Sequence, residues 1–399
     1  MSETYELLVI GGGPAGLAAA RAFREAGGDG PVAIVSDEQR MPYHRPPLTK
    51  DLLRGDSDEE SLPIEAESWL HEREVALVGG RAVHVDVSGR AVSLSGGRAL
   101  AYRHCVLATG AEPTRLPVPG ADDPAVRVLR TLDHLRELQA RLGPDDPVVV
   151  IGSGFIGCEI AASLRMRGHP VTLVSDEPAP NARRLGRAAA ALIAGWLRDL
   201  GIVLVLGSEV DRISREDSRL TVSAGARQLG ARVVVMAAGV APRGELAAAC
   251  GLELEDGAIP VDAAMRTRTE GLLAAGDVAF AFNQTAGRAL RVEHWGDALG
   301  QGAVAGRTAA GAETAWDAVP GFWSTIGEHT LKYAAWGDGF DAVSVDDENG
   351  RFSVWYGREG RIVGVLAHDC DGRYDRGRKL IATGAAWSAR DPAGSSLQI

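Results

Sequence analysis

The stretch LLVIGGGPAGLAAARAF, residues 7–23, joins an apolar run to a glycine-rich turn and an alanine-rich segment. The apolar run predicts a β-strand, and the small residues after the turn predict a helix. Gly11 permits a tight turn, Gly13 lets the backbone approach a pyrophosphate, and Gly16 lets the helix pack closely on the strand. The stretch therefore predicts a dinucleotide-binding βα unit at the start of an α/β fold.

The next predicted strand, PVAIVSDE at residues 31–38, supplies the acid that such a unit requires. Asp37 lies at about the 20-residue distance expected of a carboxylate that binds a ribose. The helix after the turn also offers free backbone N–H groups to phosphate oxygens. The expected contacts of this first nucleotide are Gly11, Gly13, Pro14, Ala15, Gly16 and Asp37.

The same pattern recurs in VVVIGSGFIGCEIAASL, residues 148–164, so we expect the chain to bind two nucleotides. The strand PVTLVSDE, residues 170–177, follows it and carries Asp176. Two such units in one chain, the first at the N-terminus, indicate FAD at the first turn and a nicotinamide nucleotide at the second. The expected contacts of the second nucleotide are Gly152, Gly154, Phe155, Ile156, Gly157 and Asp176.

Composition narrows the function classes further. The chain has 399 residues, of which 45% are hydrophobic, enough for two or three domains with their own cores. The net charge of −11 argues against a general nucleic-acid-binding role, which needs a basic footprint. No apolar run approaches the roughly 20 residues that span a bilayer, and no signal segment opens the chain. We therefore expect no membrane partner and a cytoplasmic location.

Cysteine usage argues against a metal site and against thiol chemistry. The four cysteines are widely separated, without the spacing of metal ligands. A disulfide reductase of this architecture needs a redox cysteine shortly after the first nucleotide unit, because a thiolate must reach the flavin. No cysteine lies between Met1 and His104. We expect ordinary reduced thiols and no metal.

The loop MPYHRPPLTKDLL, residues 41–53, is suited to fixing cations beside the first nucleotide. Its two prolines are expected to prevent a helix before Leu48. Arg45 and Lys50 are candidates to face the FAD pyrophosphate and the flavin ring, where negative charge needs compensation. From spacing alone, solvated surface charges are an equally good interpretation of both residues.

Further cofactor contacts are expected where apolar strands end in small residues. Val83 is a candidate for the adenine end of FAD, and the turn after HCVLATGA permits close backbone approach. The strand in TEGLLAAGDVA delivers a glycine and an acid that suit the ribityl chain, and a helix rich in small residues follows Trp295. The additional candidates are Val83, Ala108, Thr109, Gly110, Gly276, Asp277 and Trp295.

Taken in order, these motifs give the chain a recognisable pattern. It resembles the FAD-dependent pyridine-nucleotide ferredoxin reductases of oxygenase systems, the group that includes putidaredoxin reductase, rubredoxin reductase and apoptosis-inducing factor. The resemblance covers nearly the whole length. Its most specific parts are PYHRPPLTK at 42–50, ATGAEP at 108–113, VVVIGSGFIGCEIA at 148–161, AAGDVA at 274–279 and VEHWGDALGQG at 292–302.

The resemblance implies roles for individual residues. Arg45 and Lys50 are implied to contact FAD, together with Asp37, Asp277 and Trp295. Glu159, in the second nucleotide helix, is implied to lie near the nicotinamide. Lys50 and Glu159 are thereby the candidate catalytic residues.

The implied architecture is glutathione-reductase-like: two Rossmann-like nucleotide-binding domains and a small C-terminal α+β domain. HCVLATGAEP and RVVVMAAGVAP share a pattern and are interpreted as strands where the chain enters and leaves the nicotinamide domain. The expected division is an FAD-binding domain of residues 1–114 and 241–317, an NAD(P)H-binding domain of 115–240, and a C-terminal domain of 318–399.

The implied activity is electron transfer from NADH through FAD to a small iron–sulfur ferredoxin, in a monomer or homodimer. Asp176 favours NADH because it would repel a 2′-phosphate, but Ser175 occupies the strand end and Arg183 lies nearby, so NADPH remains an alternative. A ferredoxin is usually acidic, and it would need local cations for docking. Candidates are Arg288, Arg291, Arg373, Arg376, Arg378 and Lys379.

Two alternative functions stay open from the sequence. One is a flavoprotein whose redox state switches partner binding, as apoptosis-inducing factor suggests, and the other is a reductase with a different acceptor. The family's third domain commonly opens with F-W-S-D-Q, whereas this chain reads FWSTIGEH from Phe322. Trp323 is retained, but the altered stretch puts the usual acceptor surface in question.

Overall fold

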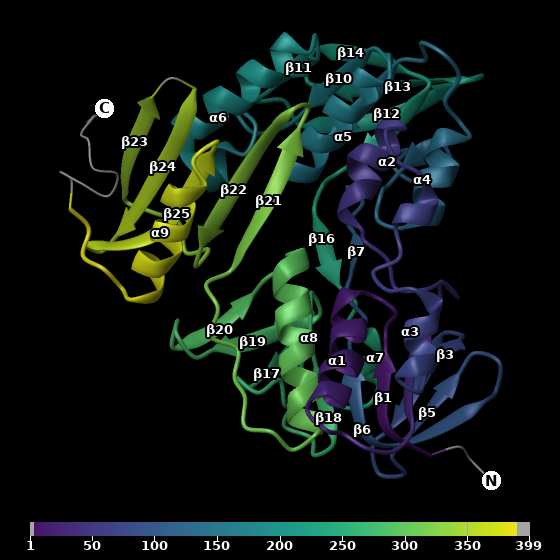
Figure 1. Cartoon of the computed structure of the whole chain (residues 1–399). Coiled ribbons are helices and arrows are strands. Elements are labelled where there is room, and N and C mark those ends of the chain that lie inside the picture. The colour runs from purple at the N-terminus through teal and green to yellow at the C-terminus, as the bar shows by residue number, and fades with distance from the viewer. Residues whose placement is uncertain (1–3, 349, 389–399) are drawn as a thin grey trace. The chain divides into compact units, whose positions relative to one another are not determined.

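The computed structural model describes residues 4–348 and 350–388, which form two compact units built from separated stretches of chain (Figure 1). The first unit contains the described residues of 1–44, 62–112 and 241–322. The second unit contains the described residues of 45–61, 113–240 and 323–399.

A parallel sheet forms the centre of the first unit. Its main strands run in the order β3, β2, β1, β6, with β18 also paired to β6, and the antiparallel hairpin of β4 and β5 extends it. The apolar runs in β1 and β2 are buried, as expected of parallel strands covered on both faces. The strand bounds are β1 Thr4–Ile10, β2 Val32–Ser36, β3 Val75–Gly79, β4 Ala82–Asp86, β5 Ala91–Leu94, β6 Ala99–Leu107 and β18 Leu272–Ala274.

Two helices of the first unit pack unusually closely. These are α1, Pro14–Glu25, and α8, Trp295–Ala309, which lie side by side in Figure 1. A β-carbon at Gly302 or Gly306 of α8 would collide with backbone carbonyl oxygens of α1, so only glycine fits there. The remaining elements are α3 Glu67–Glu72, α7 Glu245–Ala249, β17 Ile259–Val261, β19 Ala279–Asn283 and β20 Arg288–Arg291.

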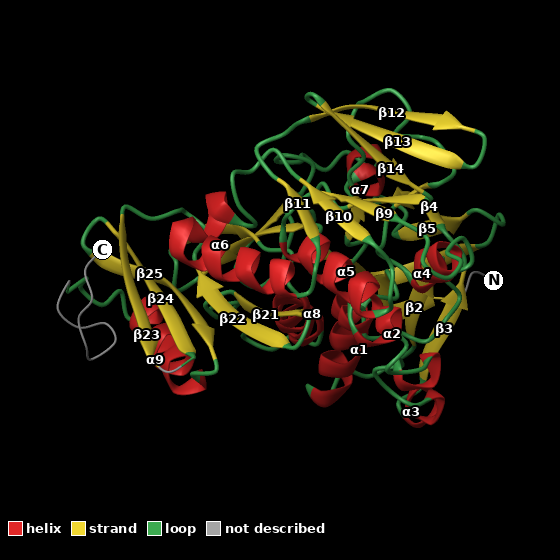
Figure 2. Cartoon of the chain, turned by 90° about the horizontal axis from the view of Figure 1, so that it is seen from above, coloured by secondary structure: helices red, strands yellow, loops and turns green. Residues whose placement is uncertain are grey.

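The second unit contains its own parallel sheet, in the order β11, β10, β9, β15, β8. An antiparallel sheet of β12, β13 and β14 packs its apolar side chains into the same core, and Figure 2 shows the two sheets. The elements are β8 Val126–Arg127, α4 Leu132–Gln139, β9 Val148–Ile151, α5 Phe155–Met166, β10 Val171–Val174, α6 Ala182–Asp199, β11 Val203–Val205, β12 Val210–Glu216, β13 Arg219–Ala224, β14 Arg227–Ala231 and β15 Val233–Met236.

The chain passes between the units in two short strands that pair with each other. These strands are β7, Ala111–Pro113, and β16, Val240–Pro242, and each spans a boundary between the units. They lie at the ends of HCVLATGAEP and RVVVMAAGVAP, the two segments interpreted from the sequence as strands where the chain enters and leaves the nicotinamide domain.

Residues 45–61, which include the proline loop from Arg45 onward, belong to the second unit. They form the 3-10 helix η1, Pro46–Thr49, the short helix α2, Asp51–Arg54, and the 3-10 helix η2, Glu59–Ser61. The helical turn starts at Pro46, earlier than the prolines were expected to allow, because a first helical turn needs no donated N–H. The loop is attached to α5, whose Ser163 hydroxyl donates to the Thr49 carbonyl at 2.7 Å.

An antiparallel sheet and one helix make up the C-terminal region. The strands run in the order β21, β22, β25, β24, β23, and Figure 1 shows α9 against this sheet. Trp355 and Tyr356 of β24 are almost fully buried in its core. The bounds are β21 Gly321–Ile326, β22 His329–Ala335, β23 Ala342–Glu348, β24 Arg351–Arg358, β25 Arg361–His368 and α9 Asp371–Ala382.

Helix α6 is broken near its start. The helix starts at Ala182, but Gly186 has φ 75°, so the regular helix is interrupted there. The break frees the Leu185 carbonyl, which accepts a hydrogen bond from the buried Tyr356 hydroxyl at 2.9 Å. The C-terminal sheet thereby stabilises the break in α6.

Candidate functional site

The first glycine-rich turn has the backbone of a phosphate-binding turn. Gly11 has φ +127°, and a β-carbon there would collide with the Ala108 carbonyl. A β-carbon at Gly16 would collide with the Gly11 carbonyl, whereas at Gly13 it would meet nothing within 4 Å. The turn is therefore closed on the protein side and open at Gly13, as the approach of a pyrophosphate requires.

The start of α1 leaves its donors to an external anion. Gly13 caps the helix without a side-chain hydrogen bond, and its first turn contains no acidic residue. Unpaired N–H groups and the positive end of the helix dipole favour a phosphate at this place. The residues present thus fit the pyrophosphate of FAD.

The first unit also contains the other expected FAD contacts around β2 and β18. Asp37 follows β2 and lies 3.6 Å from the Arg243 guanidinium. Gly276 follows β18 and donates its N–H to Gln301 Oε1 at 2.9 Å. Asp277 is buried, and Gln301 Nε2 is buried without a hydrogen-bond partner among the described residues. These polar groups add donors and acceptors to the turn's side of the sheet.

The remaining first-unit candidates differ in exposure. Trp295 begins α8 and its ring lies 5.3 Å from that of His44. The Thr109 hydroxyl donates to the Arg243 carbonyl at 2.7 Å, between buried Ala108 and Gly110 with φ +72°. Val83 on β4 is 50% exposed, so it is available to a ligand.

The second glycine-rich turn repeats the geometry of the first. Gly152 has φ +104°, and a β-carbon there would collide with the Ala237 carbonyl. A β-carbon at Gly157 would collide with the Gly152 carbonyl, and Gly154 is open. Helix α5 starts at Phe155 without an acid in its first turn, and Ile156 is 48% exposed. This turn too fits a dinucleotide pyrophosphate.

The charged side chains that an adenosine ribose would contact lie after the end of β10. Asp176 is ion-paired with Arg183 at 2.7 Å, and both side chains are largely exposed. The hydroxyl of Ser175 is buried and accepts hydrogen bonds from Ser153 at 2.8 Å and from the Glu177 N–H at 3.1 Å. Ser175 is thus occupied within the protein, and Asp176 is the acid that remains accessible.

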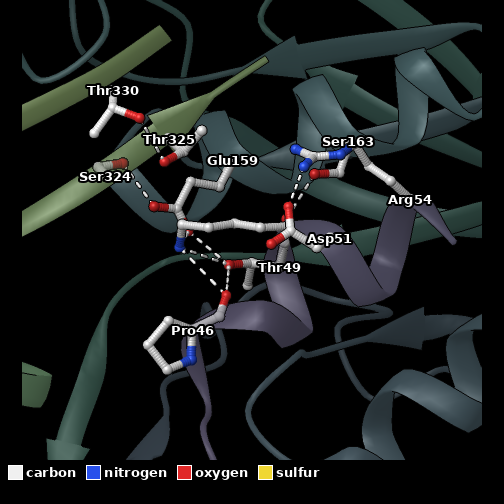
Figure 3. Close-up of polar contacts among 10 residues, drawn as sticks. Pro46, Thr49, Asp51, Arg54, Glu159, Ser163, Ser324, Thr325 and Thr330 are labelled. Carbon is white, nitrogen blue, oxygen red and sulfur yellow. Dashed lines mark hydrogen bonds and ion pairs between the residues drawn. The ribbon is translucent and has the colours of Figure 1, made fainter. Parts of the chain in front are cut away.

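A buried polar cluster lies on α5, immediately after the second turn (Figure 3). The Glu159 side chain is 3% exposed. Its Oε2 accepts hydrogen bonds from Lys50 Nζ and Thr49 Oγ1, both at 2.6 Å, and its Oε1 accepts one from Ser324 Oγ at 2.6 Å. One ammonium and two hydroxyls therefore compensate this buried carboxylate, as burial of a charge requires.

The cluster brings the two candidate catalytic residues together. Lys50 is also near the Thr49 hydroxyl and the Pro46 carbonyl, at 3.3 and 3.4 Å, so its ammonium is held on several sides. Arg45 points elsewhere: its guanidinium donates to the Arg130 carbonyl at 2.9 Å. Such a fixed, nearly dry charge pair is suited to orienting a polar ligand group and compensating charge that develops beside it.

Three members of the surrounding network were not singled out from the sequence: Thr49, Ser163 and Ser324. Thr49 precedes Lys50 in the proline loop, so its position was a usable signal. Ser163 follows Glu159 by one helical turn in an otherwise apolar run, a pattern that places both on one face. Ser324 comes from β21, far along the chain, and only the tertiary fold brings it to α5.

All four cysteines are free, and burial raises the pKa of the Cys158 thiol far above its ordinary value. Within residues 4–348 and 350–388 no group of three or more His, Cys, Asp or Glu could hold a metal ion. In the same part of the chain, no helix is both long and apolar enough to cross a bilayer.

Comparison with protein families and curated proteins adds independent evidence. The model of the pyridine nucleotide-disulphide oxidoreductase family matches residues 5–302, and the reductase C-terminal model matches residues 321–398. Rhodocoxin reductase of Rhodococcus erythropolis is 34% identical over 94% of this chain and 89% of its own length. The ferredoxin–NAD(+) reductase component of an anthranilate 1,2-dioxygenase system, from Burkholderia cepacia, is 33% identical over 95% and 94%.

Solved structures agree with this result. The crystal structure of a ferredoxin reductase from Rhodopseudomonas palustris superimposes with a TM-score of 0.91 at 32% identity, covering 97% of this chain and 96% of that one. The predicted α/β fold class, with Rossmann-like sheets and a small C-terminal region, is thereby confirmed.

Proposed function

The chain belongs to the pyridine nucleotide-disulphide oxidoreductase family, and on this premise we propose that it transfers electrons from NADH through FAD to a small ferredoxin of an oxygenase system. One difference between the two glycine-rich turns supports this proposal, because their backbone geometry is otherwise the same. The second alone is followed by a buried charge pair, between Lys50 and Glu159. That pair suits a redox site that works without a reactive thiol.

The first unit is proposed to hold FAD, in a domain of residues 1–114 and 241–317. Gly11 to Gly16 would hold the pyrophosphate, Asp37 the adenosine ribose, and Asp277 the ribityl chain, while Trp295 and Val83 would contact the rings. When bound, FAD supplies the ability to accept an electron pair and to release electrons one at a time.

The second nucleotide domain, residues 115–240, is proposed to bind the nicotinamide nucleotide. Gly152 to Gly157 would hold its pyrophosphate, and Glu159 would orient its nicotinamide. Lys50 would compensate the negative charge of a reduced flavin by electrostatics, and Arg45 would add positive charge near FAD. Neither Lys50 nor Glu159 is required to act as a nucleophile.

NADH is the proposed donor. Asp176 can accept a bond from a ribose hydroxyl and would repel a 2′-phosphate. Its partner Arg183 moderates this repulsion, because the two side chains already neutralise each other at 2.7 Å. We therefore expect a preference for NADH that is real but limited, with NADPH as a slower donor.

Ferredoxin docking is proposed to use cations of the C-terminal domain, residues 318–399. Arg373 is committed to Asp346 and Glu348 at 2.7 and 3.1 Å, which leaves α9 residues such as Arg376 and Lys379 as better candidates. Steering between exposed charges is screened beyond about 10 Å at 0.1 M ionic strength. Reduction of an acidic ferredoxin should therefore slow as salt rises. A cytoplasmic location, where thiols stay reduced, is part of the proposal.

The function is tested by cytochrome c reduction with NADH, with and without each of a panel of small ferredoxins. We expect at least one ferredoxin to accelerate electron flow strongly, and added salt to reduce that acceleration. If no ferredoxin does so while a quinone, oxygen or a disulfide is reduced efficiently, the ferredoxin reductase proposal fails. Slow reduction with a long-lived reduced nucleotide complex would instead favour the redox-switch alternative.

A further inference from the structure

The strand β21 sends one buried hydroxyl to the candidate catalytic carboxylate. Ser324 is fully buried, and its Oγ donates to Glu159 Oε1 at 2.6 Å (Figure 3). Its chain neighbours differ: Trp323 is 44% exposed, and the Thr325 hydroxyl lies 3.0 Å from that of Thr330. The alternation of the strand thus points this one side chain at α5.

The two oxygens of Glu159 have different partners, and this difference fixes the carboxylate. Oε2 receives Lys50 and Thr49, which both come from η1 and its C-cap. Among the described residues, Oε1 receives a hydrogen bond from Ser324 alone, which lies on a strand 165 residues further along the chain. Without that bond, rotation of the carboxylate would exchange its oxygens, and one of them would be buried without a donor.

We propose that Ser324 is a positioning residue for the nicotinamide: by holding Glu159 Oε1, it fixes the orientation in which Glu159 meets that ring. This inference rests on the proposed function, in which the second turn binds NADH. It makes the C-terminal region part of the nucleotide site as well as a docking surface for the acceptor.

The test compares NAD⁺ with ADP-ribose, which has the same adenosine, pyrophosphate and ribose but lacks the nicotinamide. Both ligands are titrated calorimetrically into the FAD-loaded enzyme. Ser324→Ala should weaken NAD⁺ binding about tenfold, since the lost bond is made to a charged group. It should leave ADP-ribose binding within about twofold of wild type, because the second glycine turn and Asp176 are untouched.

Two control variants separate positioning from domain attachment. Tyr356→Phe removes another buried hydroxyl contact from the C-terminal sheet, to Leu185, without touching Glu159. Thr325→Val removes the neighbouring hydroxyl of β21, whose partner is Thr330. Both should leave the ratio of the NAD⁺ and ADP-ribose dissociation constants as in wild type.

A comparison in the Glu159→Ala background keeps the inference testable if Ser324→Ala alone folds poorly. Glu159→Ala leaves the buried Lys50 ammonium without its carboxylate, but it does so equally with and without Ser324→Ala, so the two variants differ only in Ser324. The double variant should bind NAD⁺ no more weakly than Glu159→Ala alone, since Ser324 acts through Glu159.

The outcomes separate the inference from the function on which it rests. An unchanged NAD⁺ affinity in Ser324→Ala, equal weakening of both ligands, or weaker NAD⁺ binding by the double variant than by Glu159→Ala would each overturn the positioning role. Failure of the wild-type enzyme to bind either ligand would instead overturn the proposed function.

Discussion

The two glycine-rich turns share a backbone but differ in the helices that follow them. Helix α1 is lined with alanine and packs its carbonyls against Gly302 and Gly306 of α8. Helix α5 instead carries Glu159 and Ser163, both engaged with the proline loop. This difference fits the proposed roles of the two turns. The tightly packed first turn would hold FAD permanently, and the second, with its charged side chains, would bind and release the nicotinamide nucleotide.

The largest expected effect comes from adding one methyl group to each turn. A β-carbon at Gly16 or at Gly157 collides with a backbone carbonyl of its own turn, which cannot move aside cheaply. Gly16→Ala should purify with less than about a tenth of the wild-type FAD, because clashes of this kind cost about 1–3 kcal/mol or more. Gly157→Ala should stay yellow but lose reduction by NADH.

The matched control is Gly195→Ala in helix α6, where a β-carbon meets nothing within 4 Å. This variant should keep its bound FAD and its reduction by NADH, and it should gain up to about 1 kcal/mol of stability from helix propensity. Flavin absorbance per chain and its bleaching by NADH measure the outcomes. If Gly157→Ala loses FAD as Gly16→Ala does, the proposal that the two turns bind different nucleotides is wrong.

Removal of the Lys50 ammonium tests the role of its buried ion pair with Glu159 of α5. Lys50→Ala leaves Glu159 without its ammonium partner, and breaking a buried pair costs about 3–5 kcal/mol. We also expect a lower reduction potential of the flavin or weaker FAD binding, since a cation that stabilises the reduced form is lost. Thermal unfolding and a spectroelectrochemical titration measure these effects. Unchanged potential and unchanged FAD affinity would remove Lys50 from the flavin site.

Replacing each of the two candidate ribose-binding aspartates by alanine should separate their roles. Asp176→Ala frees Arg183 for a 2′-phosphate, so the efficiency with NADPH relative to NADH should rise about tenfold. Asp37→Ala should weaken FAD binding and leave that ratio as it was. Steady-state rates with both nucleotides decide this. A clear wild-type preference for NADPH would overturn the assignment of NADH.

The smallest expected effect is on acid stability. Burial, with His368 beside it, lowers the pKa of His329, so the unfolded chain binds more protons below the unfolded value of about 6.5. Stability from this group is complete above that pH and is lost as the pH falls. His329→Gln should reduce the loss between pH 7 and 5 in thermal unfolding. The reduction should be partial, because burial also lowers the pKa of His104 in the first unit.

Sequence patterns were informative wherever a local backbone requirement decides the residue. Gly16 and Gly157 are required by collisions with carbonyls five residues earlier, and Gly11 and Gly152 have positive φ, so both turns and the fold class followed from the sequence. The loop prolines were less informative, because a 3-10 turn tolerates them from Pro46.

Contacts that depend on tertiary structure were not accessible in the same way. The resemblance assigned Lys50 to FAD and Glu159 to the nicotinamide but did not predict that the two residues pair, and Ser324 was not expected at all, since 165 residues separate it from Glu159. Likewise, no local pattern shows that Arg183 neutralises Asp176 or that Arg373 is committed to Asp346. Such pairings depend on where helices and strands meet.

The central claim, one resident flavin at the first turn and a reducing nucleotide at the second with no redox thiol between them, is tested most directly by an anaerobic titration with NADH. The account predicts complete bleaching of the flavin at one equivalent of NADH per bound FAD, because no cysteine lies between Met1 and His104 to act as the redox thiol that would take up further electrons. A requirement for two equivalents, or a flavin that NADH leaves oxidised, would contradict it.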